Sequence, residues 1–241
     1  MRGICIFIVI CLSASSYGQK FIYNLNDTTV FTEYLDGKQW AYRNTGDFIV
    51  GMTNTEVKDD YGRYYQIAIV IKNLCDSSTT FYPEDVTSFL IKNNGDTLAL
   101  NVYTDEEYQK KIKNTQMWAM ILYGFSAGLN SANAGYSTSY STTYGANGTF
   151  YVTSTTHYDA VAAAQANAAM NEQIFTLSSL FENERLLKRQ GYLKITTIHP
   201  NEVITGYMNI KRKKGDFMTV NIKVGGQIYS FDWDVKKKKD K

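Results

Sequence analysis

The chain contains few of the residues that build metal centres and covalent crosslinks. Its 241 residues include only three cysteines and two histidines. Proline, which interrupts helices and sheets, occurs only twice. A zinc centre needs convergent ligands, and the sequence has no Cys pair and no His-x-x-x-His spacing. We therefore expect no metal centre and no cofactor. Asp232 and Asp234, which flank Trp233, form only a weak candidate site for calcium.

Charge of either sign is missing from one long segment. No Asp, Glu, Lys or Arg occurs from Asn114 to Tyr158, although these residues make up 20% of the chain. The segment is rich in Gly, Ala, Ser, Thr and Tyr, which predicts an insertion whose surface contacts something other than bulk water. The net charge of +2 argues against nucleic acid as a main partner, because phosphate binding needs clustered Lys and Arg. The basic cluster at 236–239 is expected to be a solvated tail, with weak contact to an anionic envelope surface as the alternative.

The N-terminus has the order of a secretory signal peptide. Arg2 precedes an apolar run at 4–12, and small residues follow at 13–16. This run is too short to serve as a permanent membrane anchor. We expect cleavage after Gly18, and export to the periplasm, the outer surface or the medium.

The cysteines give an alternative for the N-terminus and a constraint on the fold. Lipidation at Cys11 is the alternative to simple cleavage, although the β-branched residues before Cys11 are poor substitutes for the small residues of a lipobox. Cleavage leaves Cys75 as the single thiol, so no internal disulfide can form. The fold must then be held by its apolar core.

Hydrophobic alternation predicts strands on both sides of a central region. In the longest predicted strand Tyr65, Ile67, Ile69 and Ile71 share one face, as in a half-buried strand. Gly225-Gly226 predicts a hairpin turn between the last two strands. The predicted strands are 30–34, 47–52, 63–72, 86–91, 97–102, 192–198, 203–211, 217–224 and 228–233.

Helical spacing replaces this alternation after residue 103. Thr104-Asp105-Glu106-Glu107 is a capping box, in which the Thr hydroxyl and the Glu carboxylate bond to free backbone amides at the start of a helix. We expect a helix from Asp105 to about Asn130. A second helix is expected to start near Asp159 and to stop at Gly191.

Between the helices, Tyr and Thr alternate with Ser and Thr over 136–144. Asn147-Gly148 predicts a two-residue hairpin turn, which would set Tyr144 opposite Tyr151 and Thr142 opposite Thr153. Such a ribbon is either a disordered loop or a strand pair ordered by docking against another surface. Because Tyr and Ser are frequent contact residues of binding loops, we predict a partner contact by five tyrosines: Tyr136, Tyr140, Tyr144, Tyr151 and Tyr158.

The order of elements predicts a mainly β protein with an α insertion. Strands, two helices and strands again indicate an antiparallel β-sandwich interrupted by a helix-hairpin-helix excursion, since the last strands need the earlier ones to close a core. Within 193–210, Ile198-His199-Pro200-Asn201-Glu202 leads into Thr205-Gly206-Tyr207. This stretch resembles the closing strands of immunoglobulin-like sandwiches in uncharacterised bacterial envelope proteins, and the resemblance implies a fold without an activity. The expected parts are a signal peptide (1–18), the first sandwich strands (19–103), the insertion (104–191, hairpin at 136–158), the closing strands (192–235) and a basic tail (236–241).

Small residues recur four apart on both predicted helices. Such stripes let two helix backbones approach closely. We predict an intramolecular helix–helix contact, with association between copies or insertion into lipid as the alternative. The residues concerned are Gly124, Gly128 and Ala132 on the first helix and Ala160, Ala164 and Ala168 on the second.

One motif is compatible with an enzyme. Gly124-Phe125-Ser126-Ala127-Gly128 fits G-x-S-x-G and resembles the nucleophile elbow of the α/β-hydrolases, with Asp159 and His199 as possible triad partners. The upstream capping box, however, favours a helix before Ser126, and neither an oxyanion motif nor alternating βα units accompany it. We therefore expect a secreted, non-enzymatic envelope or surface protein that acts as a structural or interaction module through its insertion. A serine hydrolase and a pore-like membrane assembly through the Gly/Ala helices are the alternatives.

Overall fold

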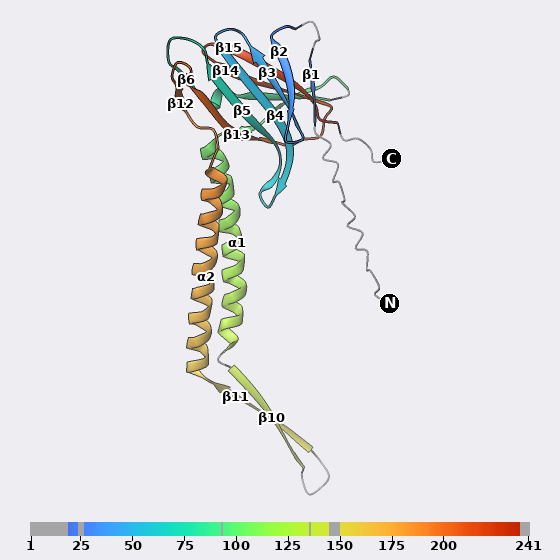
Figure 1. Cartoon of the computed structure of the whole chain (residues 1–241). Helices are drawn as coiled ribbons and strands as arrows, with labels where there is room; N and C mark the ends of the chain where they lie inside the picture. The colour runs from blue at the N-terminus through green and yellow to red at the C-terminus, as the bar shows by residue number, and fades with distance from the viewer. Residues whose placement is uncertain (1–18, 24–26, 93, 135, 145–149, 237–241) are drawn as a thin grey trace, which may run out of the picture. The chain divides into compact units, whose positions relative to one another are not determined.

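The computed structural model describes residues 19–23, 27–92, 94–134, 136–144 and 150–236, shown in Figure 1. The chain is mainly β, with antiparallel sheets and two helices. It divides into two compact units. The β unit comprises the described residues up to Thr104 together with those from Leu193 onward, and the helical unit comprises Asp105–Tyr192.

The β unit contains a six-stranded and a five-stranded antiparallel sheet. The larger sheet has the order β2 (Val30–Leu35), β3 (Lys38–Asn44), β4 (Phe48–Asp59), β5 (Gly62–Asn73), β13 (Val203–Lys211) and β9 (Val102–Tyr103). The smaller sheet has the order β1 (Lys20–Ile22), β15 (Gln227–Asp234), β14 (Phe217–Val224), β7 (Thr87–Ile91) and β8 (Thr97–Leu100). A further pair joins β12 (Thr196–Ile198) to β6 (Thr79–Phe81), and a short 3-10 helix spans Pro83–Asp85.

Strands that follow the helical unit in the chain complete sheets begun before it. β13 pairs with β5 along nine residues, from Val203 opposite Lys72 to Lys211 opposite Tyr64. β14 pairs with β7 on one side and with β15 on the other. Each of the two larger sheets therefore contains strands from before and from after the helical unit, as the order of elements predicts.

The core consists of alternating side chains from both larger sheets. The alternation predicted for β5 is confirmed for its four inward residues, which are all buried, whereas Tyr64 on the other face is buried as well. Arg43 on β3 links the two sheets, since its Nε donates to the carbonyl of Ser230 at 2.6 Å and its guanidinium lies 5.9 Å from the ring of Phe231. The buried residues of the smaller sheet are Phe21, Ser88, Leu90, Leu100, Met218, Val220, Ile222, Val224, Tyr229, Phe231 and Trp233.

Four buried or half-buried tyrosines of the β unit have raised pKa values. Burial, followed by the hydrogen bond to Glu33, raises the pKa of Tyr42 to about 12. Burial also raises the pKa of Tyr64, Tyr65 and Tyr229 above the ordinary value, because it disfavours the charged phenolate. The hydroxyl of Tyr64 donates to the carbonyl of Tyr61 at 2.7 Å, which holds the neutral form in place.

We expect the free energy of unfolding of the β unit to fall as pH rises from 10 toward 12. Unfolded tyrosines lose their proton near pH 10, whereas folded Tyr42 keeps its proton until about pH 12, so the stabilisation is complete below pH 10 and is lost through the folded pKa. Phenolate absorbance and circular dichroism, followed together against pH, measure this loss. Tyr42→Phe should remove part of it, whereas Tyr34→Phe, at a residue 75% exposed, should not. Constant stability up to pH 12 would contradict the expectation.

Candidate interaction surface

Local sequence features correctly predict where both helices begin and where α2 ends. α1 spans Asp105–Ala134 and α2 spans Ala160–Arg189. The carboxylate of Asp159 caps α2, because it accepts hydrogen bonds from the amides of Val161 and Ala162 at 2.8 and 3.1 Å. Gly191 follows α2 with φ +73°, the left-handed conformation that ends many helices. Both predicted helices are therefore present, and α1 runs past the predicted end at Asn130 to Ala134.

α1 and α2 pack against each other along a narrow and partly polar seam. Gln116 is buried and its amide donates to the carbonyl of Phe181 at 3.2 Å and to Glu184 Oε2 at 3.3 Å. The hydroxyl of Tyr123 donates to Gln173 Oε1. Apart from residues 162 and 185, which adjoin it, the buried and half-buried positions of α2 are three or four apart, as in a coiled-coil seam: residues 163, 166, 170, 174, 177, 181, 184 and 188.

The predicted small-residue contact between the helices is wrong where the structure describes it. A Cβ added to Gly124 would meet no atom within 4 Å, so the backbone of α2 does not approach Gly124 closely. Ala160, Ala164 and Ala168 are exposed, and Ala163 is the buried alanine of α2. The reason is geometric, because steps of four residues drift around a helix of 3.6 residues per turn, whereas the seam alternates steps of three and four. The packing around Gly128 and Ala132 is not described by the structure.

The helix faces outside this seam expose large apolar side chains. Trp118 on α1 is 63% exposed and Phe175 on α2 is 74% exposed. Soluble proteins expose single apolar residues freely, but several on one pair of helices indicate a contact surface. We call six of these residues the helical apolar surface: Met117, Trp118, Ile121, Leu122, Phe175 and Leu180. Sequence reasoning did not predict them as exposed contact residues, although the first four lie at positions between the buried or half-buried residues 116, 120 and 123.

A two-stranded ribbon connects the helices in the chain. It pairs β10 (Tyr136–Tyr144) with β11 (Phe150–Tyr158). The rings of Tyr136 and Tyr158 lie 4.9 Å apart, and the hydroxyls of Thr138 and Thr156 lie 3.2 Å apart on the same face. Tyr140, also on this face, is 73% exposed. Near the helices the opposite face carries Ser137, Ser139, Thr155 and His157, so this part of the ribbon has one aromatic and one hydroxyl-rich face. The register places Tyr151 opposite Thr143, and therefore on the hydroxyl-rich face instead of the face of Tyr136, Tyr140 and Tyr158.

The predicted register of the ribbon is wrong by one residue. The structure pairs Tyr144 with Phe150 instead of Tyr151, and Thr142 with Val152 instead of Thr153. The predicted turn would also have set Tyr158 opposite a serine. A one-residue shift exchanges the faces of a strand, so the observed register is the one that pairs Tyr136 with Tyr158 and Thr with Thr. Asn147 and Gly148 lie outside the described residues.

The residues considered for a serine hydrolase have other structural positions. Ser126 lies within α1, so the segment before it is helix and not the strand of a nucleophile elbow. Asp159 caps α2 in the helical unit. His199 belongs to the β unit, where its Nδ1 lies 3.0 Å from the hydroxyl of Ser78.

The free thiol and the C-terminal carboxylates also have local partners. Burial, with smaller contributions from Asp47 and Asp76, raises the pKa of Cys75, which lowers its thiolate fraction. Asp232 accepts a hydrogen bond from Thr219 at 2.6 Å, and Asp234 accepts one from the amide of residue 236 at 3.0 Å. These hydrogen bonds hold the Asp232 carboxylate between the paired strands β14 and β15 and the Asp234 carboxylate at the end of β15.

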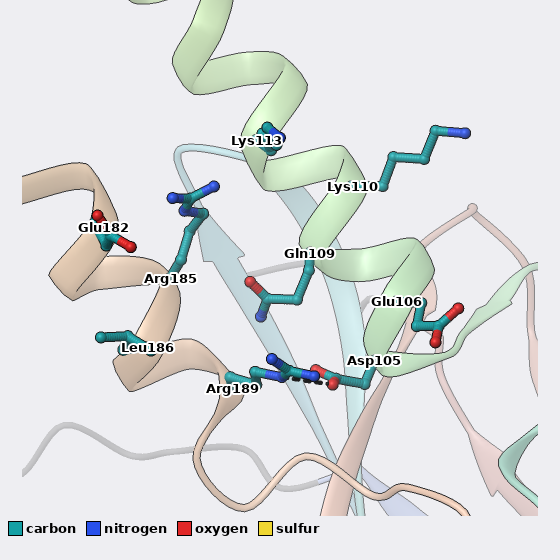
Figure 2. A pocket seen from close by; sticks show the side chains of 9 residues that line it. All are labelled: Asp105, Glu106, Gln109, Lys110, Lys113, Glu182, Arg185, Leu186 and Arg189. Carbon is teal, nitrogen blue, oxygen red and sulfur yellow. Dashed lines mark hydrogen bonds and ion pairs between the residues drawn. The ribbon is translucent and has the colours of Figure 1, made fainter. Parts of the chain in front are cut away.

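A pocket of about 430 Å³ lies between the start of α1 and the end of α2. In Figure 2, Gln109 and Arg185 point into the space between the helices, whereas Lys110 points away from it. Arg189 Nε donates to Asp105 Oδ2 at 2.8 Å, and this ion pair closes one end of the pocket. The remaining lining residues are Glu106, Lys113, Glu182 and Leu186, so the lining includes four basic and three acidic residues and the pocket favours neither sign of charge strongly.

Two common features are absent from the part of the chain that the structure describes. Neither α1 nor α2 combines the length and hydropathy needed to cross a membrane. In the same described residues, no group of three or more His, Cys, Asp or Glu side chains is placed to hold a metal ion. Comparison with family models, with curated proteins and with solved structures finds no match to this chain.

Proposed function

We propose that this chain is an exported, non-enzymatic protein of a bacterial cell envelope or surface. Its β unit is an immunoglobulin-like sandwich, and its helical unit is an insertion that acts as an interaction module. The order of charge, apolar run and small residues at 1–18 supports export. The pairing of β13 with β5 and of β14 with β7 supports an interrupted sandwich, since it joins strands from both sides of the insertion.

One observation supports the interaction role more than any other. The helical apolar surface and the exposed tyrosines of the ribbon occur in a unit that has no formal charge from Asn114 to Tyr158. Burying one large apolar side chain stabilises a complex by about 1.5–3 kcal/mol, so a partner that covers several of them gains substantial affinity. Exposed charges, which would have to be desolvated, are missing from this segment. The surface therefore favours a protein partner with an uncharged contact face.

We expect replacement of 136–157 by a short Gly/Ser linker to remove cross-links from the chain to its partners on intact cells. The thermal midpoint of the β unit should change by only a few degrees, since the ribbon belongs to the other unit. Cross-linking with mass spectrometry, and calorimetry of the purified chains, measure the two effects. Tyr34→Ser, at an exposed aromatic residue of β2, is the control and should keep the cross-links. Unchanged cross-links in the linker variant, or loss of soluble protein, would contradict the proposal.

A further inference from the structure

We propose that copies of this chain assemble head to tail, with the outer edge of β10 in one copy hydrogen-bonded to the outer edge of β11 in the next. This inference rests on the proposed function and names the partner as a second copy of the same chain. It is supported by the open edges of the ribbon, by the way other edges of the molecule are built, and by the self-complementary rows of side chains.

Both long edges of the ribbon are open in the described structure. β10 pairs with β11 and with no other described strand, and β11 likewise pairs only with β10. Each strand therefore presents a row of N–H and C=O groups along its outer side. A two-stranded ribbon is at best marginally stable alone, and pairing with a third strand would stabilise it.

The outer strands of the β unit are protected, whereas those of the ribbon are not. β1 is three residues long and contains Lys20, and β9 is two residues long. β8 has four residues, and β2 includes Glu33. Shortness and charge are the usual means by which proteins prevent edge-to-edge pairing. β10 and β11 have nine residues each, contain no Asp, Glu, Lys, Arg or Pro, and pair without a bulge.

The ribbon is complementary to itself. Each copy supplies one β10 edge and one β11 edge, so antiparallel pairing between copies can continue the pairing within a copy. In the same register, the contacts of Tyr136 with Tyr158 and of Thr138 with Thr156 would be repeated between copies. No like charges would meet, since the ribbon has none. The exposed Trp118 and Phe175 give neighbouring copies apolar area to bury as well.

Head-to-tail pairing predicts a specific type of assembly. An interface between two different surfaces of one molecule gives a closed ring when the rotation closes and a filament when it does not. A symmetric dimer, in which β10 pairs with β10 and the β11 edges stay unpaired, would instead stop at two copies. The size of the assembly therefore distinguishes the two arrangements.

The test uses the chain from residue 19 onward and two variants, each with one blocked edge. S139K/S141K places two lysines on β10, and T155K/H157K places two on β11, at positions that are exposed in the structure. In sedimentation velocity we expect the wild type to form species larger than a dimer and each variant alone to be monomeric. An equimolar mixture of the variants should form dimers and nothing larger, because one free edge of each kind remains.

Controls separate edge blocking from loss of folding. S139Q/S141Q has side chains of similar length without charge and should assemble like the wild type, and circular dichroism should show equal helix content in all variants. The proposal is overturned if the wild type is monomeric at every concentration, if the lysine variants assemble, or if the glutamine variant is also monomeric. Flotation of a monomeric wild type with phosphatidylcholine vesicles would likewise overturn it and would identify lipid as the partner. A monomeric wild type whose cellular cross-links still depend on 136–157 would leave the proposed function intact.

Discussion

Replacement of Trp233 by alanine is expected to lower the free energy of unfolding of the β unit by about 3–5 kcal/mol. Trp233 lies on β15, has no exposed surface and is among the largest fully buried side chains. Its ring lies 5.5 Å from that of Phe21, which joins β1 to the same core. Truncation would therefore leave a cavity where β1 and β15 meet and would loosen the N-terminal strand.

Two further variants identify the physical origin of this effect. The indole Nε1 of Trp233 is buried and makes no hydrogen bond in the structure, so apolar packing accounts for the stabilisation. Trp233→Phe should therefore cost less than the alanine variant. Trp118→Ala, at the exposed tryptophan of α1, should change stability by less than about 0.5 kcal/mol. Urea denaturation of the three variants measures the differences, and equal losses at both positions would contradict the assigned core.

The sequence predicted the strands whose inward positions are large and apolar. β5 was predictable because its four inward residues are Tyr65, Ile67, Ile69 and Ile71. β3 was missed because its inward positions are Gln39 and Ala41, so it has no hydrophobic period. Its burial depends on tertiary hydrogen bonds, in which the side-chain oxygen of Gln39 accepts from the amide of Phe21 at 3.0 Å. Such partners cannot be deduced from a local pattern.

The candidate surface was predictable in location but not in detail. The charge-free segment marks the helical unit, and the cap of α2 depends on residues that are neighbours in the chain. The face of α1 that packs in the seam is determined by α2, and α1 has apolar residues on more than one face. The sequence of α1 alone therefore does not identify the packed face. For this reason Trp118 was not recognised as exposed and Gly124 was wrongly placed in the contact.

The hairpin turn at Gly225-Gly226 was correctly predicted, and it places two glycines in different surroundings. Val224 pairs directly with Gln227, and the two glycines have φ +57° and +82°. A Cβ on Gly225 would overlap the ring of Phe48 on β4 and lie 2.7 Å from its Cζ, whereas a Cβ on Gly226 would meet nothing within 4 Å. An alanine at Gly226 would therefore introduce backbone strain alone, whereas an alanine at Gly225 would introduce backbone strain and a steric clash.

We expect Gly225→Ala to lower the free energy of unfolding by about 2–5 kcal/mol, from left-handed strain together with overpacking against Phe48. Gly226→Ala should cost only the strain, about 1–2 kcal/mol. Because Phe48 is buried on β4, the additional loss at Gly225 measures how closely this turn on the smaller sheet contacts a strand of the larger one. Phe48→Leu in the Gly225→Ala background should restore part of the loss. Equal destabilisation by the two alanine variants, measured by urea denaturation, would show that Phe48 does not pack against the turn.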